Sequence, residues 1–148
     1  MHIYISIGEQ KLRLFEGDTL VAEYVVSSAA NGIGFEEGSY CTPTGRFEVS
    51  EKIGDGEALG TIFKSRKPMG VWDGTPSDDD MILSRILRLN GLDAQNANSM
   101  ERYIYVHGTN HEALLGEPTS HGCIRMANAD IVEIFDRIEL RAPLLIGY

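Results

Sequence analysis

The chain has 148 residues, a formal net charge of −9 and 24% charged residues. So acidic a chain has no basic stripe that could release counterions from phosphates, which argues against a protein that binds DNA, RNA or an anionic membrane. No segment approaches the ~20 consecutive apolar residues of a membrane span. The hydrophobic content of 43% is ordinary for a globular protein, and we expect one domain over residues 1–148.

The N-terminus begins directly with a strand pattern. Ile3, Ile5 and Ile7 alternate with polar or aromatic residues, and neither a basic leader nor an export signal precedes them. If Met1 is the natural start, this favours a cytoplasmic location. A leader removed from a longer precursor would leave the same start, which keeps a periplasmic location open.

Two further strands continue the pattern over residues 12–14 and 20–26, with turns at residues 8–10 and 16–18. The first quarter of the chain is therefore predicted to be an antiparallel β-meander.

The middle of the chain is rich in loop signals. Residues 31–38 hold too many glycines for a regular element, and Thr42-Pro43-Thr44-Gly45 predicts a turn before a strand at residues 46–49. Glycine-punctuated loop is expected up to residue 74. The acidic run at residues 78–80 closes it, as a solvated face or a helix start.

Residues 81–89 fit a helical face and a strand face equally well, so periodicity alone leaves both open. Residues 103–106 are aromatic and β-branched, which predicts a strand. That strand is expected to deliver His107 at its C-terminal end.

One helix is predicted near the C-terminus, because apolar residues recur there at helical spacing: Ile131, Ile134, Phe135 and Ile138. Asn128 or Asp130 is the expected N-cap, with Glu133 as the reciprocal capping partner. We expect the helix to end at residues 141–143 and a last strand to follow at residues 144–146.

The most informative chemistry surrounds Cys123, which lies in Ser120-His121-Gly122-Cys123-Ile124-Arg125, with His107 upstream. A free thiol is mostly protonated at neutral pH, so a nucleophilic cysteine needs an imidazole that takes its proton or pairs with the thiolate. We predict His107 as this base, because residues two apart in a tight turn commonly point apart. His121 is then expected to be an orienting residue.

Three neighbours complete the predicted site. Gly122 leaves room for a substrate carbonyl and lets backbone N–H groups, including that of Cys123, converge on an oxyanion. The Gly108 carbonyl is the candidate group that orients His107. Arg125 suits a substrate carboxylate, with an intrachain ion pair as the alternative.

The cysteines and histidines also allow two other interpretations. Cys41 has no histidine or cation near it in sequence, which favours a small packed side chain. A zinc site could draw on His107, His111, His121 and Cys123, but their spacing fits neither CxxC nor HExxH. We expect neither a metal nor another cofactor.

These residues resemble the signature of the L,D-transpeptidase (YkuD-type) catalytic domain: a histidine, a loop, then Ser/Thr-His-Gly-Cys, a hydrophobic residue and Arg or Asn. The opening strands through Leu12-Arg13-Leu14-Phe15 and the segment Thr42-Pro43-Thr44-Gly45-Arg46-Phe47 extend the likeness over most of the chain. The resemblance implies a mainly β fold with one or two helices, a β-sandwich or curved mixed sheet in a single domain. It therefore favours a strand at residues 81–89.

The resemblance also implies an activity and a set of site residues. Cys123 would attack the L,D bond before the terminal D-alanine of a peptidoglycan tetrapeptide or muropeptide and form a thioester, with His107 as general base and acid. The other implied roles are oxyanion or orienting residues (His121, Gly122, Gly108 and Ser120) and substrate-binding residues (Arg125 and Thr109).

Three functions remain open at this stage. A cytosolic member meets soluble muropeptides, which predicts an L,D-carboxypeptidase that uses water as acceptor during wall recycling. An exported member would instead be a crosslinking L,D-transpeptidase, and a non-catalytic muropeptide-binding domain is the alternative of another class. Covalent labelling of Cys123 by a carbapenem is expected for either enzyme.

Overall fold

The computed structural model describes all of residues 1–148. It contains ten strands, one α-helix, α1 (Asn128–Arg137), and two short 3-10 helices, η1 (Ala94–Asn96) and η2 (Glu112–Leu114). The strands are β1 (His2–Ser6), β2 (Lys11–Glu16), β3 (Thr19–Ser27), β4 (Gly45–Ile53), β5 (Thr61–Lys64), β6 (Lys67–Val71), β7 (Ile82–Gly91), β8 (Tyr105–Gly108), β9 (Ile124–Met126) and β10 (Pro143–Gly147).

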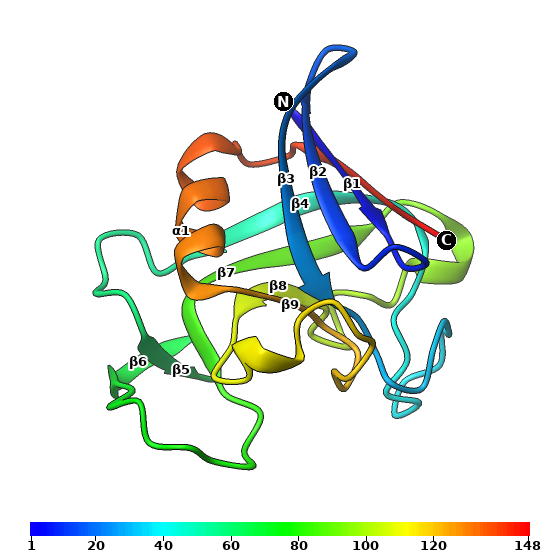
Figure 1. The fold of residues 1–148 in the computed structure, drawn as a ribbon. Helices are drawn as coiled ribbons and strands as arrows, with labels where there is room; N and C mark the ends of the chain where they lie inside the picture. The colour runs from blue at the N-terminus through cyan, green and yellow to red at the C-terminus, as the bar shows by residue number, and fades with distance from the viewer.

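The strands form one mixed sheet that closes into a barrel-like sandwich (Figure 1). Eight strands follow each other in the order β4-β10-β1-β2-β3-β9-β8-β7, and β4 pairs with β7 to close the ring. The β5–β6 hairpin extends the sheet outward from β7. The predicted meander is confirmed, since β1, β2 and β3 pair antiparallel, whereas β1–β10 and β8–β9 are parallel.

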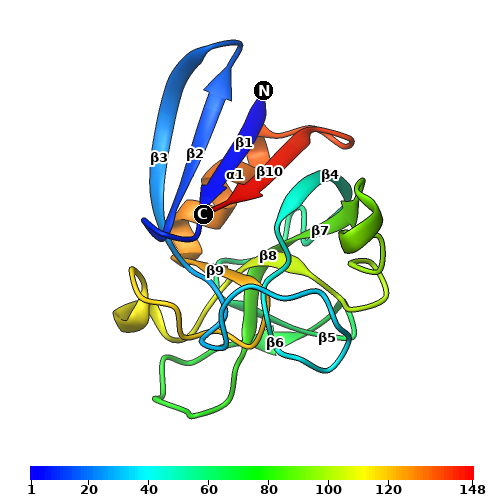
Figure 2. The ribbon, with the colours of Figure 1, turned by 90° about the vertical axis from the view of Figure 1, so that its right-hand side faces the viewer.

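A continuous apolar core fills the closed sheet. Alternate residues of each strand point inward, and 21 buried side chains form one cluster that includes Leu12, Val49 and Leu89. Helix α1 adds Ile131, Ile134 and Phe135 at the predicted helical spacing, its C-cap Ile138 is buried in the same cluster, and the helix packs against β7 and β8. Figure 2 shows β1 and β10 side by side, so the first and last strands of the chain are neighbours in the sheet.

Residues 82–91 form strand β7, which settles the ambiguity at residues 81–89. Both neighbours of this segment are strands, β4 on one side and β8 on the other, so its backbone groups are paired across the sheet.

Several element boundaries differ from the predictions. Strand β8 begins at Tyr105 because Tyr103 has a left-handed φ of 56°, so His107 lies within the strand rather than after it. The β5–β6 hairpin was predicted as loop. Its turn uses Ser65 and Arg66, both at positive φ, where the usual glycine or asparagine signal is missing.

The capping prediction for α1 was wrong. The N-cap is Ala127, whose side chain cannot accept a hydrogen bond, and the Asn128 N–H donates instead to the Glu112 carboxylate at 2.8 Å. Glu133 accepts a hydrogen bond from the Tyr24 hydroxyl at 2.6 Å. The helix also ends at Arg137, earlier than predicted.

A bilayer-spanning helix would need at least 18 residues with a strongly apolar stretch, and none of the helices here meets that requirement.

Candidate active site

The parallel pair β8–β9 places the predicted catalytic residues on one face. Val106 pairs with Ile124 and His107 pairs with Arg125. Val106 and Ile124 point into the core, so the alternating side chains of Tyr105, His107, Cys123 and Arg125 point to the opposite face. His107 therefore lies beside Arg125 and diagonally across the ladder from Cys123.

The turn that carries Cys123 is held by its own hydrogen bonds. The Ser120 hydroxyl donates to the Cys123 carbonyl at 2.6 Å and accepts from the Gly122 N–H at 3.2 Å. Gly122 has a φ of 127°, and a Cβ there would lie 3.2 Å from the Cys41 carbonyl oxygen, so glycine is required.

The predicted turn at residues 42–45 is hydrogen-bonded to the catalytic turn, residues 120–123. Thr42 is fully buried, and its hydroxyl donates to the Gly122 carbonyl at 2.8 Å while accepting from the Ala29 N–H at 2.9 Å. Thr42 of the Thr-Pro-Thr-Gly segment therefore fixes the backbone of the Ser-His-Gly-Cys motif at Gly122.

The Cys123 thiol rests in its protonated form. Its sulfur donates to the Tyr103 carbonyl at 3.3 Å and accepts from the Tyr105 N–H at 3.4 Å. Burial raises the pKa of the thiol to about 11, an effect that the Tyr105 N–H and the guanidinium of Arg125 oppose. The nucleophile must therefore lose its proton during the reaction.

His107 has the position and the neutral charge state of a general base. The ring is buried, and Nδ1 lies 2.6 Å from the Gly108 carbonyl oxygen, so Nδ1 carries the proton and Nε2 is left as the acceptor. Burial lowers the pKa of this imidazole, which keeps it neutral. Gly108 itself has no room for a side chain, because a Cβ would lie 2.5 Å from the Leu83 carbonyl oxygen.

Two predicted substrate-binding residues are not exposed to a substrate. The Arg125 side chain is 4% exposed and forms an ion pair with Asp80 at 2.9 Å, which is the alternative considered for it above. Thr109 is fully buried, and its hydroxyl accepts from the His111 N–H at 3.0 Å. Neither side chain lines the cavity at Cys123 in this structure.

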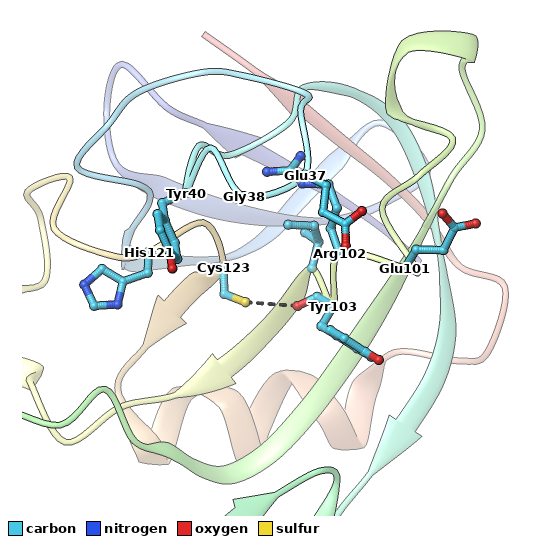
Figure 3. A pocket seen from close by; sticks show the side chains of 9 residues that line it. Glu37, Gly38, Tyr40, Glu101, Arg102, Tyr103, His121 and Cys123 are labelled. Atoms are coloured by element: carbon cyan, nitrogen blue, oxygen red, sulfur yellow. Dashed lines mark hydrogen bonds between the residues drawn. The ribbon is translucent and has the colours of Figure 1, made fainter.

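The cavity at Cys123 has a volume of about 190 Å³ (Figure 3). His121 and Tyr40 stand on one side of the thiol in the figure, and Arg102 stands on the other. The cavity is lined by Glu37, Gly38, Tyr40, Glu101, Arg102, Tyr103, Ile104, His121 and Cys123. The sulfur is thus accessible to a ligand although its surroundings are densely packed.

Sequence reasoning missed several of these residues. Arg102 anchors the rim, since its guanidinium donates to the Cys41 carbonyl at 2.8 Å. Asp80 is neither part of a solvated face nor a helix start, because it pairs with Arg125 and lies 3.4 Å from His121 Nδ1. No local pattern marked these contacts, which join segments far apart in the chain.

His111 and Cys41 have separate environments. His111 Nε2 lies 2.9 Å from the Asp79 carbonyl oxygen, and no cluster of three or more His, Cys, Asp or Glu side chains has the arrangement of a metal site. Cys41 is half-buried in a loop, outside both apolar clusters, with its sulfur 3.5 Å from the Asn31 carbonyl oxygen. Cys41 is thus a partly buried side chain packed against Gly34, where an added Cβ would lie 2.7 Å from the Cys41 Cβ.

Known structures share this fold. An L,D-transpeptidase from Mycobacterium smegmatis superposes with a TM-score of 0.65 at 15% identity, over 99% of this chain and 58% of that one. L,D-transpeptidase 3 from Mycobacterium tuberculosis, solved with a faropenem-derived adduct, gives 0.64 at 18% identity, over 99% and 59%.

Sequence comparison gives the family. The YqjB protein of Bacillus subtilis strain 168 is 32% identical over 105 residues, 71% of this chain and 51% of that protein. The YkuD protein of the same strain is 36% identical over 61 residues, 40% of this chain and 37% of that protein. The chain thus spans about half of the first relative and little more than a third of the second. The YkuD family, described as the L,D-transpeptidase catalytic domain, matches residues 1–146, and the chain belongs to this family.

Proposed function

We propose that the protein is a cysteine acyltransferase that cleaves the L,D peptide bond before the terminal D-alanine of a peptidoglycan tetrapeptide. The observation that carries the proposal is the Cys123 sulfur at an open cavity, with a neutral imidazole held on the adjacent strand by its Nδ1–H. Membership of the YkuD family supports the substrate class.

In the proposed first half-reaction, one proton passes from Cys123 to His107 and then from His107 to the leaving amine. His107 Nε2 takes the proton of Cys123, and the sulfur attacks the carbonyl carbon of the third stem residue. The Cys123 N–H, which has no acceptor within the chain, stabilises the oxyanion, whereas the Gly122 N–H is already engaged by Ser120. His107 then protonates the amine of D-alanine, which leaves behind a thioester.

The second half-reaction depends on the acceptor. We propose water, which makes the enzyme an L,D-carboxypeptidase that trims soluble tetrapeptides to tripeptides during wall recycling. A cytoplasmic location goes with this proposal because soluble muropeptides are the donors available there. The alternative is an exported L,D-transpeptidase in which an amine takes the acyl group.

A β-lactam should react at the same sulfur. Relatives with this fold include an L,D-transpeptidase solved with imipenem and one solved with a faropenem-derived adduct. We propose that a carbapenem acylates Cys123, since opening of the strained lactam by the thiolate parallels thioester formation.

The deciding experiment is incubation with a soluble tetrapeptide muropeptide, with and without a D-amino acid, followed by mass spectrometry. A tripeptide product supports hydrolysis, and an exchanged tetrapeptide or crosslinked dimer supports transpeptidation. Cys123→Ala is the control and should leave the substrate intact. A folded wild-type protein that binds the muropeptide without turnover or carbapenem labelling would identify a non-catalytic binding domain instead.

Fractionation of cells that express the untagged native gene tests the location separately. Recovery with soluble cytoplasmic markers supports recycling, and recovery in the periplasm or wall fraction supports the exported alternative.

A further inference from the structure

The loop between β6 and β7, residues 72–81, brings a carboxylate to the catalytic face. Asp80 Oδ1 lies 2.9 Å from Arg125 Nη2, and Asp80 Oδ2 lies 3.4 Å from His121 Nδ1. Arg125 is the ladder partner of His107. The carboxylate thus contacts the turn that carries the thiol at His121, and it contacts strand β9 at Arg125, beside the imidazole.

The position of Asp80 is fixed by the segment that follows His107. The Met81 N–H donates to Asn110 Oδ1 at 3.1 Å, and Asn110 Nδ2 donates to the Asp79 carbonyl at 3.0 Å. His111 Nε2 lies 2.9 Å from the same carbonyl oxygen. These contacts tie both ends of the Asp79–Met81 segment to residues 110–111, so the carboxylate cannot move away without breaking them.

Arg125 needs this partner. Its side chain is 4% exposed, whereas that of Asp80 is 25% exposed, and a buried cation without a counterion is strongly unfavourable. Alone, the cation would favour a thiolate and oppose an imidazolium. The carboxylate has the opposite effect on both groups: Asp80 raises the pKa values of Cys123 and His107, and Arg125 lowers them.

We propose that Asp80 is a positioning residue of the active site, which holds Arg125 in register opposite His107 and cancels its charge so that thiol and imidazole rest as an uncharged pair. The inference rests on the proposed roles of Cys123 and His107. It predicts that the Cys123 thiolate forms only by proton transfer to His107, and that the positive charge of Arg125 does not by itself stabilise a resting thiolate.

Other charged or titratable groups also surround the pair, and the test leaves them unchanged. They are Arg102, Glu37, Glu101 and His121 around the cavity, Tyr103 and Tyr105 beside the thiol, and Arg66, which donates to the Tyr105 hydroxyl.

The test measures the rate of iodoacetamide alkylation at Cys123 against pH, with mass spectrometry to separate this site from Cys41. The wild-type rate should follow a thiol with a pKa of about 11. Asp80→Asn should shift the profile to lower pH by about one unit, so alkylation at about pH 9 becomes about tenfold faster. Arg125→Met should shift it to higher pH, and the double variant should return close to wild type.

Asp78→Asn is the matched control, because this exposed carboxylate lies two residues away and its removal changes the net charge equally. It should leave the profile unchanged. An unshifted profile in Asp80→Asn, or a double variant that keeps the shift of either single variant, overturns the inference.

If Asp80→Asn does not fold, the upward shift of Arg125→Met and its reversal in the double variant decide the question. The double variant replaces a buried ion pair by neutral side chains, a change that folded proteins often tolerate. Failure of the proposed function has a different signature, in which Cys123 is alkylated with the expected profiles but the tetrapeptide is not cleaved.

Discussion

At the scale of single residues, the site is an uncharged cysteine and histidine rather than a preformed ion pair. Burial raises the pKa of Cys123 and lowers that of His107, so each group is neutral near pH 7. Of the two ways in which an imidazole can activate a thiol, the structure favours removal of the proton over pairing with a thiolate. The Gly108 carbonyl fixes the tautomer that this role requires.

Replacing the base tests this role directly. His107→Gln should lower kcat/KM by at least ~10²-fold, since an amide cannot accept the thiol proton. Steady-state kinetics on the tetrapeptide measure the loss, with circular dichroism to show that the variant folds. Activity close to wild type would transfer the role of base to another residue, with His121 the first candidate.

The buried imidazole also predicts how stability depends on pH. The folded-state pKa of His107 lies below the ordinary 6.5. Just below about pH 6.5, this imidazole is therefore protonated in the unfolded chain but still neutral in the folded chain. The free energy of unfolding should therefore decrease as the pH falls from about 6.5 toward 5.5. Urea titrations at each pH measure this slope, and His107→Gln should reduce it; an equal slope in the variant would contradict the assignment.

At the scale of elements, the catalytic residues depend on contacts between segments that are distant in sequence. The turn at residues 120–123 is supported by Thr42, and the N-terminus of α1 is capped by Glu112 from η2. Asn128, the first residue of α1, in turn donates to the Thr109 carbonyl at 2.9 Å. The helix thereby fixes the segment that follows His107.

The distant cap can be measured. Glu112→Ala removes the acceptor of two Asn128 donors, at 2.8 and 3.0 Å, and should lower the free energy of unfolding by about 1 kcal/mol. Glu117→Ala, an exposed glutamate a few residues away, is the control and should change it little. Equal effects of the two substitutions in denaturant titrations would show that Glu112 does not cap the helix.

At the scale of the whole molecule, closure of the sheet between β4 and β7 sets the stability of the site. This β4–β7 seam completes the ring of strands that includes β8 and β9, and the catalytic side chains lie on the outer face of that ring. Leu89 of β7 pairs with Val49 of β4, and both are fully buried in the main core. The catalytic strands are therefore held by packing that lies on the opposite side of the sheet from the chemistry.

Truncation at the seam should be costly. Leu89→Ala should lower the free energy of unfolding by about 2–5 kcal/mol, because it leaves a cavity in a closely packed core. Leu20→Ala, whose side chain is half exposed in β3, is the control and should change it by far less. Denaturant unfolding measures both, and comparable losses would show that the seam is not a principal source of stability.

The sequence by itself determined the features that short-range rules specify. Alternation of apolar residues predicted the opening strands, an apolar run after Pro143 predicted the last one, helical spacing predicted α1, and the Ser-His-Gly-Cys motif with its upstream histidine indicated the family. Periodicity left residues 81–89 open, the family resemblance favoured a strand there, and the structure has strand β7 at residues 82–91. Only the tertiary structure decided that Asp80 pairs with Arg125 and that Glu112 caps α1. The physical reason is range: periodicity and propensity act within a few residues, whereas burial, ion pairing and distant capping arise only when folding brings separated segments together.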